Sequence, residues 1–164
     1  MSHKHIWAKL LAVKDGKTIA TSLFTCLKCG LLKIGKHTIR ISKSRLDMGN
    51  LPIKGIKTGT FQQEYDNGSK TEAFIIDWTN GQKQKVTISG TDLGITFANP
   101  PGPGNLILKI VQGGSGNNTL SWTTVPKWPC GSAPTLSTAA GAVDIISFYW
   151  DGTNYYGLAN TNFS

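Results

Sequence analysis

Residues 143–163, VDIISFYWDGTNYYGLANTNF, decide the fold of this chain. They begin with a strongly apolar and aromatic run, VDIISFYW, whose length is typical of a β-strand. The pair Asp151-Gly152 then predicts a tight hairpin turn, because glycine readily adopts the positive φ that such turns need. Residues 154–163 are therefore expected to form the antiparallel return strand.

Short apolar runs of the same kind recur upstream. Further strands are expected at residues 71–78, 83–89, 93–98, 106–112 and 119–125.

Turn residues separate these runs. Asn80-Gly81 predicts a hairpin, and the Pro/Gly-rich residues 99–105 predict a surface loop. Residues 113–118, GGSGNN, lack the lysine and the following helix of a phosphate-binding loop. We interpret them as a hairpin turn that brings residues 119–125 back as an antiparallel partner.

Composition agrees with a chain of strands and tight turns. The 164 residues include 19 glycines, and only 16% of them are charged. The sequence predicts an all-β fold, an antiparallel β-sandwich of jelly-roll type, over residues 61–164. No apolar run reaches the length of about 18 residues that a membrane-spanning helix needs.

Charge divides the chain into two regions. Residues 1–57 carry ten Lys and two Arg against two Asp, a net +10, whereas residues 58–164 carry five Lys against seven Asp and Glu, a net −2. Residues 1–60 are therefore expected to be a basic N-terminal anchoring region, either an extended arm or a small β-subdomain, that meets an acidic partner. The expected anchoring side chains are Lys28, Lys33, Lys36, Arg40, Lys43, Arg45, Lys54 and Lys57.

Metal and catalytic signals are weak. The candidate metal ligands are Cys26, Cys29 and His37, but a zinc site needs four ligands and this spacing is not a usual one. The carboxylates are scattered and no histidine follows His37, so a catalytic triad is not predicted. A separated acid pair such as Asp77 and Asp144 is the remaining glycosidase candidate. We expect no metal, no cofactor and no enzymatic activity.

Aromatic residues gather late in the sequence. Strand alternation places Phe148 and Trp150 on one face and Tyr149 on the other. Part of the set is expected to fill the core, and the rest to contact a glycan or another subunit. The candidates for such contacts are Trp128, Tyr149, Trp150, Tyr155 and Tyr156.

Asp144 follows a Gly-rich loop and opens an apolar strand. Short acids in such places accept backbone N–H groups. We expect Asp144 to be a structural pin for the preceding loop.

Three ordered segments of the sequence resemble a domain found at the C-terminal ends of bacteriophage virion proteins such as tail fibre, head fibre and minor structural proteins. They read DWTNGQKQKVTISG, ITFANPPGPGNLILKIVQGGSGNNTLSW and KWPCGSAPTLSTAAGAVDIISFYWDGTNYYG. The resemblance covers residues 77–163 and does not extend to residues 1–60. It implies a virion role and a β-sandwich fold, often in trimers.

The expected function is therefore that of a non-enzymatic virion structural protein. It would be a capsid decoration, head-fibre, tail-fibre or spike subunit, assembled in the host cytoplasm, because the first residues lack the features of a signal peptide. Its expected partners are its own copies in a homotrimer and other capsid or tail proteins. One alternative is an adhesion module that binds a host receptor or surface glycan. The other is nucleic-acid binding through residues 1–57, which carry no interleaved aromatic and basic pattern.

Overall fold

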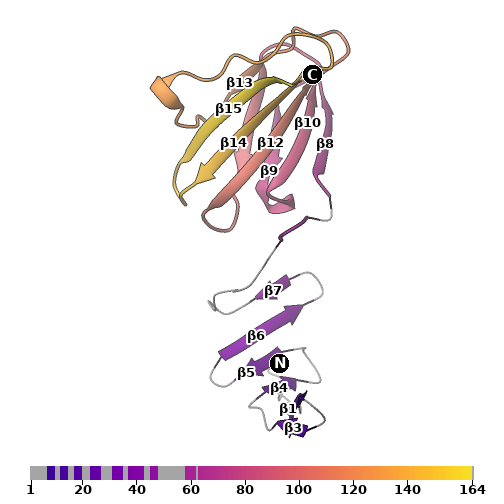
Figure 1. Ribbon diagram of the computed structural model, residues 1–164. Helices are drawn as coiled ribbons and strands as arrows, with labels where there is room; N and C mark the ends of the chain where they lie inside the picture. Colours follow the sequence, from indigo (N-terminus) through magenta and orange to yellow (C-terminus); the bar gives the residue numbers. More distant parts are fainter. Residues whose placement is uncertain are drawn as a thin grey trace. The chain divides into compact units, whose positions relative to one another are not determined.

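The computed structural model describes residues 58–61 and 63–163 and, within residues 1–57, the strands β1 to β7. The chain divides into two compact units, Met1–Gly59 and Thr60–Ser164. The division lies one residue before the boundary that the sequence suggests. We call these the N-terminal unit and the C-terminal unit and describe each by itself (Figure 1).

The N-terminal unit contains short antiparallel strands. One sheet has the order β1-β4-β5-β6-β7, and β2 pairs with β3. Of the two forms that the sequence left open, the described strands make a small β-subdomain rather than an extended arm. The strands are β1 (Trp7–Lys9), β2 (Ala12–Lys14), β3 (Lys17–Ile19), β4 (Leu23–Cys26), β5 (Leu31–Ile34), β6 (His37–Ser42) and β7 (Arg45–Asp47).

The C-terminal unit is also built of β-strands, so the expected all-β class is confirmed for the described residues. Its two sheets have the orders β15-β14-β12-β10-β8 and β13-β11-β9. No described helix is long and apolar enough to cross a membrane. The strands are β8 (Tyr65–Lys70), β9 (Phe74–Asp77), β10 (Lys83–Ile88), β11 (Leu93–Ala98), β12 (Gly104–Gln112), β13 (Leu120–Trp122), β14 (Val143–Trp150) and β15 (Tyr155–Phe163), with short 3₁₀ turns η1 (Trp78–Asn80) and η2 (Pro129–Gly131).

The expectation of an all-antiparallel arrangement is wrong for this unit. Strand β10 lies parallel to both β8 and β12, and β11 lies parallel to both β9 and β13. The cause is that the chain from β8 to β13 crosses to the other sheet after every strand. The chain reverses direction at each crossing. After two crossings it is back in the first sheet and runs in its original direction, so it pairs parallel with its neighbour there. Among the described strands of the C-terminal unit, only β12, β14 and β15 are antiparallel neighbours.

Two of the predicted hairpins are therefore crossings between sheets. Asn80 lies in η1, where the Asp77 carboxylate accepts the backbone N–H of Thr79 (2.9 Å), and buried Gln84 donates to the Asp77 carbonyl (2.7 Å). These bonds turn the chain from β9 into the other sheet. The hairpin at Asp151-Gly152 is confirmed, because β14 and β15 pair antiparallel across it.

The predicted turn at residues 113–118 also crosses between sheets. The buried side chains of Gln112 and Asn118 hold its two ends together, with the Asn118 amide donating to Gln112 Oε1 (2.9 Å) and Gln112 Nε2 donating to the Asn118 carbonyl (2.9 Å). The segment then enters β13 beside β11, not beside β12.

The two sheets of the C-terminal unit share one apolar core. Ile76 on β9, Ile95 on β11 and Leu108 on β12 are fully buried members of the same cluster. The predicted alternation of β14 is confirmed, since Phe148 and Trp150 are buried and Tyr149 is 52% exposed. The ring of Phe148 lies edge-to-face with that of Phe97 on the other sheet, at a centroid distance of 5.1 Å.

Candidate ligand-binding groove

A groove crosses the outer face of β12, β14 and β15, which are the antiparallel strands of the larger sheet. Side chains on this face alternate with core side chains and form rows across the strands. Two adjacent rows border the groove. The first row is Asn105, Tyr149 and Tyr156, and the second is Ile107, Ser147 and Leu158.

The small side chain of Ser147 explains the hollow beside the second row. Ser147 lies between Ile107 and Leu158 in the cross-strand register and covers less of the sheet backbone than these two larger residues. The groove has a volume of about 750 Å³, within the range of roughly 300–1,000 Å³ that is usual for ligand sites. Its lining residues are Asn105, Leu106, Ile107, Lys127, Trp128, Pro129, Ser147, Phe148, Tyr149, Tyr156, Gly157 and Leu158.

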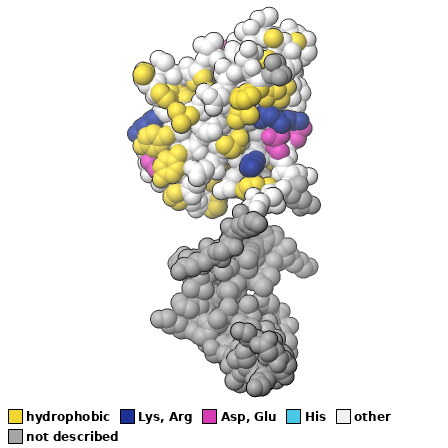
Figure 2. Space-filling view, in the orientation of Figure 1, with side chains coloured by type: hydrophobic (Ala, Val, Ile, Leu, Met, Phe, Trp, Pro, Cys, Tyr) yellow, Lys and Arg dark blue, Asp and Glu magenta, His cyan; other side chains and the backbone are white. Residues whose placement is uncertain are grey.

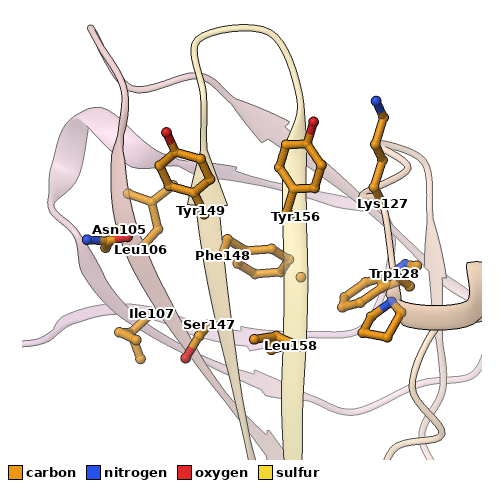
Figure 3. A pocket seen from close by; sticks show the side chains of 12 residues that line it. Asn105, Leu106, Ile107, Lys127, Trp128, Ser147, Phe148, Tyr149, Tyr156 and Leu158 are labelled. Carbon is orange, nitrogen blue, oxygen red and sulfur yellow. The ribbon is translucent and has the colours of Figure 1, made fainter.

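Two tyrosines form the aromatic part of the groove. The ring centroids of Tyr149 and Tyr156 lie 6.2 Å apart with an interplanar angle of 30°, and both side chains are substantially exposed. Figure 3 shows the rings side by side, with their hydroxyl groups and the Lys127 ammonium pointing the same way. The Lys127 Nζ lies 5.4 Å from the centroid of the Tyr156 ring, within the range of a cation–π contact.

The segment around Lys127 closes one end of the groove by pairing with the edge of β15. The Lys127 N–H donates to the Tyr155 carbonyl (2.7 Å), and the Gly157 N–H donates to the Lys127 carbonyl (3.0 Å). The next residue, Trp128, is buried against Gly157, where a Cβ would lie 2.2 Å from the indole ring. Glycine at position 157 thus lets the tryptophan approach, and this packing fixes the backbone that carries Lys127.

Three of the five predicted contact residues line the groove, namely Trp128, Tyr149 and Tyr156, but Trp128 is a buried member of the core and only the two tyrosines are exposed. Trp150 and Tyr155 do not belong to the groove, because they point inward, are nearly fully buried and pack on each other at 4.3 Å between ring centroids. The expectation of an exposed contact at these two positions is wrong, since strand alternation turns both toward the core.

Sequence reasoning missed Lys127, Asn105, Ile107, Ser147 and Leu158. The last four could have been found from the cross-strand register, but only if β12 had been paired with β14. The sequence analysis instead paired residues 106–112 with residues 119–125, which hid these two rows.

Asp144 is almost completely buried at the start of β14. Its Oδ2 accepts the Ser137 N–H (2.8 Å), while its Oδ1 accepts the Ser137 hydroxyl (2.6 Å) and the Asn162 N–H (2.9 Å). The carboxylate therefore connects the preceding loop to the last strand. These contacts are those of a structural acid, and they occupy both oxygens.

The other candidate acid, Asp77, caps η1 through the backbone N–H and hydroxyl of Thr79. These two hydrogen bonds, the hydroxyl first, hold the Asp77 pKa below its usual value of 3.8. Among the lining residues of the groove there is no Asp, Glu, His or Cys. The groove therefore offers surfaces and hydrogen-bonding groups for binding.

The candidates of the N-terminal unit lie largely outside the described residues. Five of the eight anchoring candidates and one metal candidate have no described position: Lys28, Cys29, Lys36, Lys43, Lys54 and Lys57. The others are placed by their strands alone: Cys26 on β4, Lys33 on β5, His37 and Arg40 on β6, and Arg45 on β7. Among the side chains that the structure does describe, no group of three or more His, Cys, Asp or Glu is arranged to hold a metal ion.

Ionic contacts on the same sheet face lie to one side of the groove, toward β8. Lys85 pairs with Asp66 (2.7 Å), and Lys109 pairs with Glu64 (2.6 Å). In the space-filling view, hydrophobic side chains are spread over the C-terminal unit, with a few charged groups among them (Figure 2). The face thus has an ion-paired part on β8, β10 and β12 and an aromatic part on β14 and β15.

No protein-family model, no curated protein and no solved structure matches this chain.

Proposed function

We propose that this protein is a non-enzymatic structural component of a bacteriophage virion, a capsid decoration, head-fibre, tail-fibre or spike subunit. The observation that carries the proposal is the division into two compact units of unlike charge. The N-terminal unit has a net charge of +10 and the C-terminal unit −2. A basic unit can dock on an acidic particle surface while the other unit remains free to project.

The C-terminal unit serves as a rigid projecting body in this proposal. We take it as a β-sandwich, because residues of both sheets share one core, with parallel pairs in place of a wholly antiparallel jelly roll. The resemblance of residues 77–163 to virion domains supports this role and favours assembly as a homotrimer.

Incorporation into particles tests the docking role of the basic unit. The full chain carrying Lys28→Gln, Lys33→Gln and Lys36→Gln is expected to lose most of its copies from purified particles. A matched control carries Lys70→Gln, Lys83→Gln and Lys85→Gln in the C-terminal unit and is expected to be incorporated normally. Quantitative mass spectrometry of particles measures both, and equal incorporation of the two variants would contradict the proposal.

The groove supports a second candidate function, adhesion to a receptor or glycan on the host surface. The observation that favours it is the exposure of Tyr149 and Tyr156 beside a hollow on a rigid sheet. Binding of the purified protein to host cells, compared with the Tyr149→Ala variant, tests this function. Equal cell binding by the two proteins would count against it.

A further inference from the structure

We propose that the groove binds an acidic oligosaccharide, with sugar rings packed on Tyr149 and Tyr156 and a sugar carboxylate paired with Lys127. The inference deepens the second candidate function, adhesion, and rests on it. It is independent of how the N-terminal unit attaches to a particle.

The first argument is shape. The groove runs across three strands between two rows of side chains and is bounded at one end by the backbone of Lys127. Every strand under it is held by main-chain hydrogen bonds, so the hollow needs no rearrangement to form. A preformed hollow on an open sheet face suits an extended ligand that lies across the strands.

The second argument is the match of polar and apolar groups. A sugar ring has a face of C–H groups and an edge of hydroxyl groups, and the electron-rich face of an aromatic ring attracts the C–H groups. Tyr149 and Tyr156 present their rings side by side, with their hydroxyls at one end (Figure 3). Ser147 and Asn105 add hydrogen-bonding groups in the adjacent rows.

The third argument is charge. Lys127 is the charged side chain among the lining residues, and within the described part of the chain it takes part in neither of the two ion pairs. The nearby turn holds Asp151, which does not line the groove. Its carboxylate accepts the N–H groups of Asn154 and Thr153 (both 2.7 Å), and these bonds, with smaller contributions from the Asn154 and Tyr156 side chains, hold its pKa below 3.8. An anionic ligand therefore complements the groove better than a neutral or cationic one.

A proline-rich peptide is the main alternative among extended ligands, since such peptides also dock on aromatic surfaces. A peptide of this type would contact the tyrosine rings, but it carries no negative charge to pair with the Lys127 ammonium. The saccharide accounts for both the rings and the cation.

The experiment measures binding of the purified full chain to a panel of linear uronic-acid oligosaccharides of three to five sugars. Each member is supplied as the free carboxylate and as its methyl ester, so that the pair differs in the charge of each carboxyl group and otherwise only by one methyl group on each. Isothermal titration gives the dissociation constants. The expected result is binding of an acidic member at least about tenfold tighter than its ester, weakening with added salt.

Four variants of the full chain locate the interaction. Ser147→Leu fills the groove from the outer face and is expected to abolish binding. Tyr149→Ala should weaken binding at least about tenfold, and Tyr149→Phe should retain it. Lys127→Gln should remove the preference for the acid over the ester, while Lys83→Gln, a lysine elsewhere on the sheet, should keep it. Circular dichroism checks that each variant is folded.

Four outcomes would overturn the proposal. These are equal binding of acid and ester, full binding by Ser147→Leu, an unchanged acid preference in Lys127→Gln, and no binding of any acidic member at millimolar concentration. If no saccharide binds, binding of a proline-rich peptide would assign the groove to a peptide partner. Self-association that is lost in Ser147→Leu would instead assign it to a second copy of this chain. Binding of the purified native chain to host cells is measured in parallel, so that cell binding without saccharide binding rejects this ligand while leaving the adhesion function intact.

Discussion

The two faces of β14 and β15 are formed by alternating residues of the same two strands but differ in burial and packing. On the inner face Phe148, Trp150 and Tyr155 are buried and packed ring against ring. On the outer face Tyr149 and Tyr156 are exposed and lie beside each other, and the Lys127 ammonium lies over the Tyr156 ring. Aromatic character alone therefore does not indicate a binding site. The side of the sheet decides whether a ring stabilises the fold or remains available to a partner.

The largest expected effect comes from truncating the inner face. Phe148 is 2% exposed and lies at the junction of both sheets, so Phe148→Ala should lower the free energy of unfolding by about 3–5 kcal/mol. Tyr149→Ala, one residue away on the outer face, should cost less than about 1 kcal/mol. Urea denaturation measures both, and similar losses would break the distinction between the two faces.

The next effect concerns the acid on the inner side of β14. Asp144→Ala removes the buried carboxylate that accepts the N–H groups of Ser137 and Asn162, and losing these charge-assisted hydrogen bonds should cost about 1.5–3 kcal/mol. Ser137→Ala removes one hydroxyl contact and should cost about 1 kcal/mol. Thermal denaturation followed by circular dichroism compares them. An unchanged midpoint in Asp144→Ala would show that the loop is held by other contacts.

A smaller, pH-dependent effect is expected from the inner-face hydroxyl of Tyr155, which donates to Asn99 Oδ1 (2.8 Å). Burial raises the pKa of Tyr155 from 10.0 to about 12. The unfolded chain therefore loses this proton first, and the stabilisation, complete below pH 10, disappears as the pH rises toward 12.

Tyr155→Phe removes both the hydrogen bond and the titration. It should cost about 1 kcal/mol at neutral pH, and the variant should lose stability less steeply above pH 10 than the native protein. Denaturation at several pH values tests this, with Tyr149→Phe on the outer face as the control that should follow the native curve. If Tyr155→Phe loses stability above pH 10 as steeply as the native protein does, the pH dependence does not come from Tyr155.

The smallest effect belongs to the ion pair on the outer face. Hydrogen bonds from Lys85 and the Gly68 N–H hold the Asp66 pKa below 3.8. A lowered pKa in the folded state means that any stabilisation is present above about pH 4 and is lost as the pH falls through the folded value. Because Asp66 is exposed and Lys85 is partly exposed, Asp66→Asn should barely change the melting midpoint at pH 7. A large shift there would show that the outer face contributes more to stability than its exposure suggests.

Local patterns predicted much of the C-terminal unit. Alternation in VDIISFYW correctly assigned Phe148 and Trp150 to one face and Tyr149 to the other, because side chains alternate in any strand whatever its partners. The Asp151-Gly152 hairpin followed from turn chemistry that requires only neighbouring residues. The same chemistry failed at Asn80-Gly81, where the buried Gln84 side chain donates to the carbonyls of Asp77 and Gly81 and the chain crosses to the other sheet.

The groove, too, could be predicted from the sequence only in part. Exposed tyrosines were foreseeable from the pattern, but the hollow depends on Ser147 lying between Ile107 and Leu158, residues contributed by three strands. Trp150 and Tyr155 were equally good candidates by composition, and only their inward position excluded them. Lys127 joins the site because its backbone pairs with β15 beside Gly157.

The sequence by itself determined the all-β character of the described residues, the hairpin of β14 and β15, and the uneven distribution of charge. These depend on properties of single residues and their near neighbours. Only the tertiary structure decided that the strands alternate between two sheets, that parallel pairs result, and that a groove crosses β12, β14 and β15. The physical reason is that a strand's sequence specifies which face is apolar, whereas its neighbours are chosen by how all the apolar faces are buried together.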